Sequence, residues 1–352
     1  MNSASTSDGE HTGQAGAVMD SEMNEQPRCL ASLFARREEI IEQVRALAPR
    51  ELAGTVLVAR GSSDHAATCG AYFLEIASGR PVALTSPSIQ TLYRARTDFR
   101  GYLMIAASQS GQTPEIVEVV ERARAYGARA IAVTNEPASP LAAAADLVVD
   151  ISAGRERAVP ATKTVTAQVA VFATIAQAFG DLGLEARAAE RLPGQVGEVL
   201  ADLSPVEGLA EWLASSDRLL TVARGLLYGA AQEVALKVEE TTARLTAAFS
   251  AADLRHGPIA IATSGAPVLA FVHPGPAASD VSDVVGDLRS RGAPTRVLGP
   301  VPGADFGWSS DVPEVLAPVL AIVRGQQLAL SLARLLGLNP DAPAGLTKVT
   351  IT

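Results

Sequence analysis

The sequence predicts an α/β protein made of two tandem doubly wound domains, each a parallel sheet in a three-layer αβα arrangement. Short apolar runs alternate with helical segments, which is typical of parallel sheets that are covered on both faces. The same order of segments returns in the second half of the chain. At 352 residues, with 48% hydrophobic and 19% charged residues, the chain is long enough for two domains of ordinary size.

The first half of the chain is expected to hold strands and helices in alternation. The predicted strands are Thr55–Ala59, Pro81–Thr85, Leu103–Ala107, Ala130–Thr134 and Leu147–Asp150. The predicted helices are Ala66–Ser78, Ile116–Tyr126, Pro140–Ala145 and Lys163–Phe179. The last helix contains the longest apolar run, but polar residues at positions 166, 168, 174 and 177 interrupt it. We therefore expect a buried helix there and no membrane span.

Four matches at nearly one offset indicate the internal repeat. The segment Val58-Ala59-Arg60-Gly61 returns as Val222-Ala223-Arg224-Gly225, 164 residues later (position 58 to position 222). At the same offset Ala66-Ala67 returns as Ala230-Ala231, and Gly111 corresponds to Gly275. Gly127-Ala128 returns as Gly292-Ala293 at an offset of 165 (position 127 to position 292). Matches in one register predict a duplicated domain.

The repeat divides the chain into a first domain over residues 28–190 and a second over residues 205–335, joined near Glu185–Ser204. Residues 1–27 are polar and lack the apolar core of a signal peptide. They are predicted to form a disordered tail, and the protein is expected to be cytoplasmic. Residues 336–352 are predicted to form a C-terminal tail.

The charge and the cysteines restrict the classes of partner. A formal net charge of −9 argues against nucleic acid or an anionic membrane as the main partner. A small anionic substrate remains possible, because the local field of a pocket matters more than the net charge. Cys29 and Cys69 have neither the spacing of a metal site nor that of a redox motif.

The loop Ser108-Gln109-Ser110-Gly111-Gln112-Thr113 is predicted to bind a phosphate monoester. It follows an apolar strand and precedes a helix with Thr113 as N-cap and Pro114 in the first position. Backbone N–H groups, the helix dipole and three hydroxyls converge there, and the loop holds no lysine of the P-loop type. The alternative is an ordinary polar loop. The second repeat has Val272-His273-Pro274-Gly275-Pro276 at this place, so the site belongs to the first repeat.

A second hydroxyl loop, Gly61-Ser62-Ser63, follows the first strand. Parallel strands present their carboxyl ends at one edge of the sheet, where such folds bind ligands. The two loops are therefore expected to share a site. The alternative for this segment is a plain N-cap turn.

Acid–base residues are expected from the second repeat. Glu233, Lys237 and Glu240 have the spacing i, i+4, i+7, which puts them on one face of a helix. His256 follows before Gly257-Pro258, and a carboxylate with an imidazole is the pair needed to isomerise a sugar. The alternatives are a solvated ion-paired face for the helix and an ordinary loop position for His256.

Two more segments are candidates for the site. The segment from Glu156 to Lys163 leads into the long apolar helix with Thr162 in the cap position, and its alternative is a plain helix start. The Pro-rich end of the chain carries Lys348 among β-branched neighbours. This lysine could fold back over a site, although such tails are usually frayed.

In this order, the five segments resemble the sugar isomerase (SIS) family, specifically the tandem isomerase domain of glucosamine-6-phosphate synthase and its shorter deaminase-like relatives. The resemblance extends from about residue 40 to the C-terminus. It implies a sugar-phosphate site formed by the two hydroxyl loops: Gly61, Ser62, Ser63, Ser108, Gln109, Ser110 and Thr113. It implies no metal and no organic cofactor.

The resemblance also implies roles for the other candidates. Glu240 matches the carboxylate that moves a proton between C1 and C2, with Lys237 and Glu233 as supporting residues. His256 matches a ring-opening histidine that comes from the neighbouring subunit, which implies a homodimer. Glu156 matches an active-site carboxylate, and Val159 matches a backbone contact to the sugar. Lys348 matches a lysine of the C-terminal tail that lies over the substrate.

Departures from the family pattern shape the functional hypothesis. The segment before residue 28 is too short for a glutaminase domain, so no hydrolysis of glutamine is expected. Ala161 stands where the synthase has serine, and Arg60 puts a cation near the phosphate loop. The leading hypothesis is deamination of glucosamine 6-phosphate to fructose 6-phosphate. The alternatives are synthesis from free ammonia, deamination of a galactosamine or fructosamine phosphate, or a non-catalytic sugar-phosphate sensor.

Overall fold

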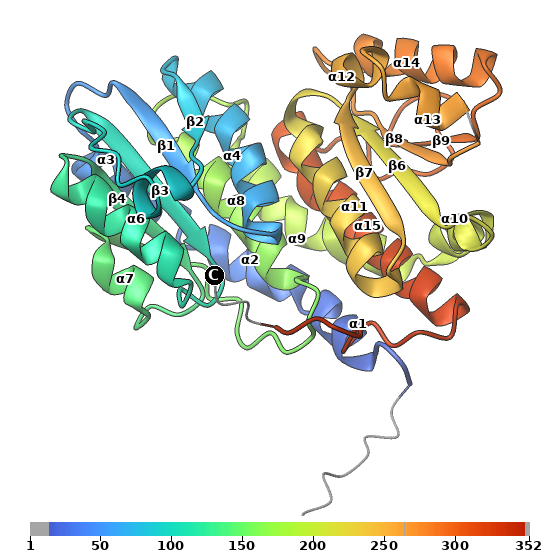
Figure 1. The fold of residues 1–352 in the computed structure, drawn as a ribbon, viewed down its shortest axis with the longest axis horizontal. Helices are drawn as coiled ribbons and strands as arrows, with labels where there is room; N and C mark the ends of the chain where they lie inside the picture. The colour runs from blue at the N-terminus through green and yellow to red at the C-terminus, as the bar shows by residue number, and fades with distance from the viewer. Residues whose placement is uncertain (1–13, 264, 349–352) are drawn as a thin grey trace, which may run out of the picture.

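The computed structural model describes residues 14–263 and 265–348 and contains two parallel sheets (Figure 1). The first sheet has the strand order β2-β1-β3-β4-β5 and the second the order β7-β6-β8-β9. The strands are β1 (Gly54–Val58), β2 (Val82–Leu84), β3 (Tyr102–Ser108), β4 (Arg129–Thr134), β5 (Leu147–Asp150), β6 (Arg218–Ala223), β7 (Leu245–Ser250), β8 (Val268–Phe271) and β9 (Thr295–Leu298). Both sheets share the order 2-1-3-4 that is typical of doubly wound folds, and the first sheet has a fifth strand next to its fourth. The prediction of two tandem domains of this class is confirmed.

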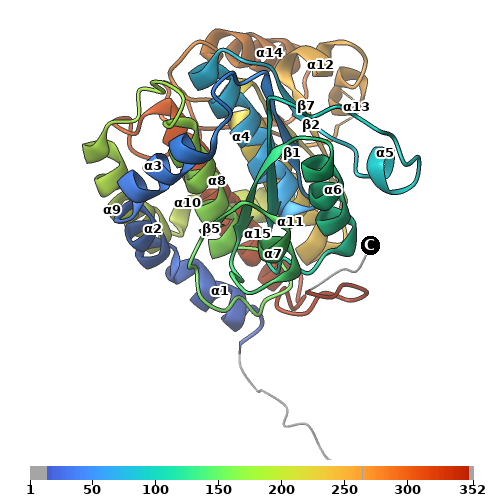
Figure 2. The same ribbon diagram turned by 90° about the vertical axis from the view of Figure 1, so that its left-hand side faces the viewer.

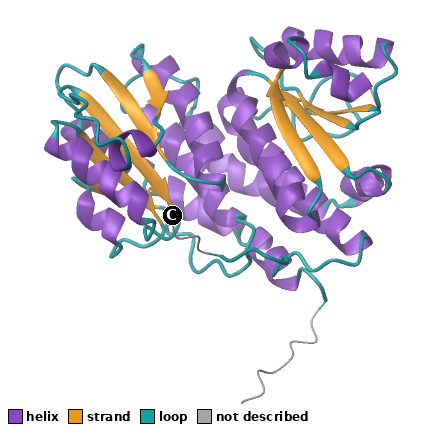
Figure 3. Ribbon diagram, in the orientation of Figure 1, coloured by secondary structure: helices purple, strands orange, loops and turns teal. Residues whose placement is uncertain are grey.

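Helices surround both sheets and also fill the space between them (Figure 3). They are α1 (Ala17–Asn24), α2 (Gln26–Phe34), α3 (Arg37–Leu47), α4 (Ser62–Ser78), α5 (Ser88–Thr91), α6 (Pro114–Ala125), α7 (Pro140–Ala144), α8 (Lys163–Ala176), α9 (Ala186–Ala201), α10 (Ser204–Ala214), α11 (Tyr228–Thr242), α12 (Ala251–Arg255), α13 (Ile259–Thr263), α14 (Ala278–Ser290) and α15 (Ala317–Leu335). Helix α4 begins at Ser62 instead of Ala66, because the N–H groups of Asp64 and His65 already donate to the Gly61 carbonyl. The predicted connection near Glu185–Ser204 consists mainly of α9.

The first sheet is covered on both faces, as its apolar strands predict. Helices α6 and α7 lie on one face, and α4 and α8 lie on the other (Figure 2). Leu103 and Ile105 of β3 point to the α4 side, while Met104 and Ala106 point to the α6 side. All of these side chains are fully buried. Every residue of α8 is also buried, in agreement with the prediction of a core helix.

One helical stretch of the described residues, Glu314–Leu335, is long and apolar enough to cross a membrane. Within it, 94% of the most apolar window is buried inside the protein. Helix α15 packs against α11 and α10, and its apolar surface is used by these contacts. The stretch is therefore accounted for as a core helix.

The two repeats meet through equivalent helices. Helix α4 follows β1, α11 follows β6, and the two helices pack directly against each other. Their backbones approach closely at Gly229, where a Cβ atom would lie 2.5 Å from the His65 carbonyl oxygen and 2.6 Å from Cys69 Sγ. The largest hydrophobic cluster contains residues of both repeats. The domains therefore share one core, and the α4–α11 contact fixes how they face each other.

The prediction of a disordered tail over residues 1–27 is wrong for residues 17–27, which form α1 and the start of α2. Met19 and Met23 are buried and pack with Ala158 and Leu330. The mainly polar composition concealed a helical spacing of apolar residues, Met19, Met23, Leu30 and Leu33, that continues through α2. Residues 1–13 lie outside the described residues.

Replacing Gly229 with Ala is expected to lower the free energy of unfolding by about 1–3 kcal/mol, because the new methyl group would overlap the backbone of α4. Urea unfolding measures this change. Gly208→Ala is the matched control, since nothing lies within 4 Å of a Cβ atom there. The control should raise stability by up to about 1 kcal/mol through helix propensity. Equal effects of the two substitutions would contradict a close α4–α11 contact.

Candidate functional site

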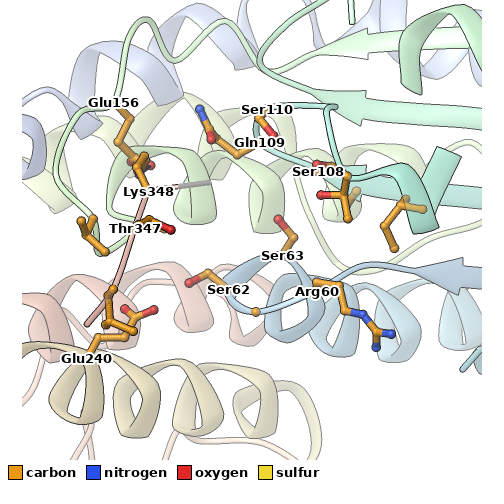
Figure 4. A pocket seen from close by; sticks show the side chains of 17 residues that line it. Arg60, Ser62, Ser63, Ser108, Gln109, Ser110, Glu156, Glu240, Thr347 and Lys348 are labelled. Atoms are coloured by element: carbon orange, nitrogen blue, oxygen red, sulfur yellow. Dashed lines mark hydrogen bonds and ion pairs between the residues drawn. The ribbon is translucent and has the colours of Figure 1, made fainter. Parts of the chain in front are cut away.

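A cavity of about 250 Å³ lies at the carboxyl ends of the strands of the first sheet (Figure 4). It is lined by both hydroxyl loops, by the segment before α8, by α11 and by the C-terminal tail. The candidate residues that line it are Gly61, Ser62, Ser63, Ser108, Gln109, Ser110, Thr113, Glu156, Val159, Glu240 and Lys348. The structure thus gathers most of the predicted site from segments far apart in the sequence. Its size is at the small end of ligand pockets.

The Ser108–Thr113 loop turns tightly at the edge of the sheet. The Ser108 hydroxyl accepts a hydrogen bond from the Gly111 N–H at 3.1 Å, and the Ser110 hydroxyl accepts one from the Gln112 N–H at 3.3 Å. Gly111 has a φ of 60°, and a Cβ atom there would lie 2.1 Å from Ser139 Oγ. Only glycine fits this turn, which holds the hydroxyls toward the cavity.

Thr113 occupies the N-cap position of α6 and Pro114 the first helical position, as predicted. The Thr113 side chain makes no capping hydrogen bond and lines the cavity instead. On the facing loop, Gly61 has a φ of 56°, and Ser63 points toward Ser108 across the cavity (Figure 4). Two helix N-termini with hydroxyl side chains therefore face one small space. This arrangement suits a phosphate group.

Arg60 lines the same cavity and is paired with Glu115 of the first turn of α6. The guanidinium Nη2 lies 2.7 Å from the Glu115 carboxylate, and Nε lies 3.2 Å from it. The second repeat has the same pair as Arg224 and Asp280, at 2.6 Å. The ion pair is therefore common to both repeats. In the first repeat, Arg60 neutralises the charge of Glu115 beside the hydroxyl loop.

The second repeat lacks the features of an anion site. Its equivalent loop contains Pro274 and Pro276, which have no N–H group to donate. A Cβ atom on Gly275 would lie 2.3 Å from a carboxylate oxygen of Glu314. An acidic side chain thus lies against the loop where an anion would have to bind. That only the first repeat holds a phosphate site remains a prediction.

Glu156 is fully buried at the N-terminus of α8. Its carboxylate accepts hydrogen bonds from the N–H groups of Thr162 at 2.9 Å and Thr164 at 3.1 Å, and from the Thr164 hydroxyl at 2.7 Å. Thr162 has the predicted N-cap position, but its side chain makes no capping bond, so Glu156 caps the helix in its place. Both oxygens of Glu156 are engaged in this way.

The C-terminal tail reaches the same carboxylate. Lys348 Nζ lies 2.7 Å from the Glu156 carboxylate, and the two side chains lie side by side at the cavity (Figure 4). Burial would raise the pKa of Glu156, but Lys348 and the α8 hydrogen bonds outweigh it and hold the pKa below its usual value. Glu156 is therefore ionised, and it anchors Lys348 above the cavity.

Glu22 supports the segment next to Glu156, and sequence reasoning missed it. Its carboxylate accepts hydrogen bonds from the N–H groups of Arg157 at 2.5 Å and Ala158 at 3.1 Å. The Val159 N–H donates to the Asp341 carbonyl at 3.2 Å. Helix α1 and the tail thus hold the backbone that lines the cavity. The helical spacing of apolar residues in α1 could have revealed this element.

The cluster on α11 is buried, so the alternative of a solvated face is wrong. Glu233 and Lys237 have fully buried side chains, and that of Glu240 is 22% exposed. Lys237 Nζ makes a close ion pair with Glu240, lies 3.4 Å from Glu233, and donates to the Ser62 hydroxyl at 3.1 Å. Lys237 and Glu233 do not line the cavity but lie behind Glu240 and Ser62.

The pKa values of this cluster follow from burial and charge. Burial raises the pKa of Glu240 above its usual value, against the opposing pull of Lys237. Burial would also raise the pKa of Glu233, but Lys237 and His65 outweigh it, so that pKa is lowered. A carboxylate with a raised pKa at a cavity wall suits a general base or acid. Glu240 is the group of the cluster that has access to a ligand.

His256 is not brought to the cavity within one chain. It is exposed at the C-terminal end of α12, in the second domain. That His256 reaches the cavity of a neighbouring subunit remains a prediction. Among the described residues, no group of three or more His, Cys, Asp and Glu side chains is placed to hold a metal ion.

Comparisons with known proteins agree with this architecture. The SIS domain model matches residues 55–178 and 212–300, one segment in each repeat. A glutamine–fructose-6-phosphate aminotransferase (isomerizing) from Symbiobacterium thermophilum is 32% identical over 93% of this chain, which spans 58% of that relative.

Solved structures show the same fold over nearly the whole chain. A protein of Silicibacter pomeroyi, provisionally assigned as a phosphosugar isomerase, is 31% identical with a TM-score of 0.81, covering 92% of this chain and 99% of that one. A glucosamine-6-phosphate deaminase of Thermotoga maritima has a TM-score of 0.70 over 93% of this chain and 100% of that one. At 21% identity, the latter likeness shows the fold alone.

Replacing Arg60 with Met is expected to weaken binding of a hexose 6-phosphate about fivefold, or about 1 kcal/mol, since Glu115 would face the phosphate unpaired. Adding Glu115→Gln should restore most of the affinity. Isothermal titration at low salt measures both. Arg224→Met, in the equivalent pair of the second repeat, is the matched control and should leave binding unchanged. An equal loss in the control would contradict this placement.

Proposed function

Because this chain belongs to the SIS domain family, we propose that it is an amino-sugar-phosphate isomerase that works in the deaminating direction. Its substrate is glucosamine 6-phosphate, and its products are fructose 6-phosphate and ammonia. The observation that carries the proposal is the position of Glu240. This carboxylate of the second repeat lines the same cavity as the hydroxyl loops of the first repeat (Figure 4).

The phosphate group is held by neutral donors in this proposal. Ser63, Ser108, Ser110 and Thr113 present hydroxyls to one space, with the backbone N–H groups of two helix starts behind them. A phosphate held at this end directs the sugar carbons toward Glu240 and the tail. Fixing the substrate in this way lowers the entropic part of the barrier.

The chemistry is a proton transfer between neighbouring carbons. Glu240 removes the proton from C2 of the open-chain aldehyde, which gives an enolamine, and returns a proton to C1. The product is an imine at C2, and water adds to it and releases ammonia and the ketone. The ammonium of Lys237, in contact with Glu240, orients the carboxylate while the proton moves.

Ring opening needs a second acid–base group, for which we propose His256 of a second copy of the chain. It is exposed in the second domain and does not line the cavity of its own chain. Lys348, anchored by Glu156, lies over the sugar end of the cavity and provides a positive charge next to the oxygen of C1. The working unit in this proposal is a homodimer.

A second candidate function is the reverse flux, in which free ammonia and fructose 6-phosphate form the amino sugar. The name of the Symbiobacterium thermophilum relative, an isomerizing aminotransferase, favours this direction. The two candidates use the same enolamine and the same residues. Release of ammonia from a panel of amino-sugar phosphates, measured beside its uptake with fructose 6-phosphate, distinguishes them.

Replacing Glu240 with Gln is expected to lower kcat by about 10²–10⁴-fold, because the amide cannot take the C2 proton. Exchange of the C2 proton with deuterium oxide, followed by NMR, should stop while the affinity for fructose 6-phosphate is retained. Glu239→Gln is the matched control, since Glu239 is the exposed neighbour on α11. Continued exchange in the Glu240 variant would remove this residue as the base.

The pH profile of kcat is expected to show an acid limb above the ordinary glutamate pKa of about 4.3, because burial raises the pKa of Glu240. As the pH falls through this pKa, the carboxylate is protonated and the rate falls. The substrate phosphate titrates near pH 6, so kcat at saturating substrate is the quantity to follow. A rate that stays constant down to pH 4 would contradict this assignment.

A further inference from the structure

His65 connects the two repeats behind the site. It lies on α4 of the first domain, three residues after Ser62, and its side chain is 19% exposed. Its Nδ1 atom lies 2.8 Å from a carboxylate oxygen of Glu233 on α11. His65 does not line the cavity, and the sequence analysis did not select it.

The contact places His65 at the end of a row of charged groups. Glu233 lies next to Lys237, and Lys237 lies next to Glu240, which faces the cavity. Two carboxylates therefore share one buried ammonium group. In the structure Lys237 is closer to Glu240 than to Glu233, where the separation is 3.4 Å. Of the two carboxylates, Glu233 is the one farther from Lys237, and His65 contacts Glu233.

The proton on His65 follows from the chemistry of its partner. Lys237 and His65 hold the pKa of Glu233 below its usual value against the effect of burial, so this carboxylate is ionised. An ionised carboxylate can only accept hydrogen bonds. Nδ1 must therefore carry the proton and donate it to Glu233. One of the two carboxylates thus has a donor of its own, besides the shared lysine.

We propose that His65 is a positioning residue for the proton transfer, which donates to Oε2 of Glu233 so that Lys237 stays in contact with Glu240. This inference rests on the proposed function. Without the imidazole donor, the buried Glu233 carboxylate would draw Lys237 toward itself. Glu240 would then lose its ammonium partner, and the protonated form of Glu240 would persist to higher pH.

The α4–α11 contact makes this arrangement possible. Gly229, which stands 164 residues after His65 (position 65 to position 229), lets the two backbones approach. Glu233 lies one helical turn after Gly229 on the same face of α11. The equivalent positions of the two repeats thus carry an imidazole in one copy and no side chain in the other. Duplication followed by divergence placed the histidine against the acid–base helix.

Other charged and titratable groups surround this row and belong in any account of its pH dependence. Asp64 precedes His65 on α4, and Cys69, also on α4, lies near Glu233 of α11. From the tail, Lys348 acts on Glu240. None of these is replaced in the test, so their effects are common to all variants.

The test compares His65→Leu with His65→Asn. Leucine removes the donor, while the asparagine amide can place an N–H group near the position of Nδ1. In His65→Leu, kcat should fall about tenfold with unchanged KM, and the acid limb of kcat should move up by about one pH unit. His65→Asn should restore both values to near those of the wild type. Thermal unfolding of each variant reports its fold.

The outcomes separate this inference from the proposed function. Unchanged kcat and acid limb in folded His65→Leu, or equal losses in both variants, would overturn the positioning role. Nitrogen-15 NMR of wild-type histidines provides a readout without substrate and without the leucine variant. A proton on Nδ1 of His65 supports the inference, and a proton on Nε2 alone overturns it. Wild-type protein that turns over no sugar phosphate would contradict the proposed function and the positioning role that rests on it, whereas the position of the His65 proton tests the contact with Glu233 by itself.

Discussion

The contact between α4 and α11 is the constraint on which the site depends. Neither repeat alone has both the hydroxyl loops and Glu240 at the cavity wall. The hydroxyl loops follow β1 and β3 of the first sheet, while Glu240 lies on a helix that follows a strand of the second. Because Gly229 lets the helices touch, Glu240 and Lys237 come within reach of Ser62.

Duplication explains why the two copies complement each other. Both keep the strand order and the ion pair beside the first loop, represented by Arg60 in one and Arg224 in the other. The first copy keeps hydroxyls and N–H groups at its second loop. The second copy has prolines there and a carboxylate of Glu314 against Gly275, but it carries the charged helix face. In the proposed function, binding and proton transfer are thus divided between the copies.

Local patterns were sufficient to predict the five strands of the first sheet, because a short apolar run bounded by turn residues is typical of a buried parallel strand. Long-range contacts were not predictable in this way. In the sequence, His65 directly precedes the predicted helix Ala66–Ser78, and no local pattern distinguishes it. Its contact with Glu233, which is 168 positions away, is visible only in the folded structure. Glu22 lies in a segment of mainly polar composition, and its role depends on the backbone of residues 157 and 158. The sequence pattern also predicted Thr162 as the N-cap of α8. In the structure, the Glu156 carboxylate accepts the hydrogen bonds from the N–H groups at the start of this helix.

Buried ion pairs around the cavity are difficult to explain by stability alone. Removing charged groups from water is expensive, and a well-packed apolar pair is often at least as stable. Yet Glu156 holds Lys348, and Lys237 lies between Glu233 and Glu240, all of them buried or nearly so. Each pair keeps an ammonium group in a fixed place near where the proposed function puts the sugar carbons. An enolamine develops negative charge at its oxygen, and fixed cations lower the energy of that charge without reorganising during the reaction. The desolvation cost of these pairs is therefore consistent with a catalytic arrangement in which the fold maintains charges that the reaction needs.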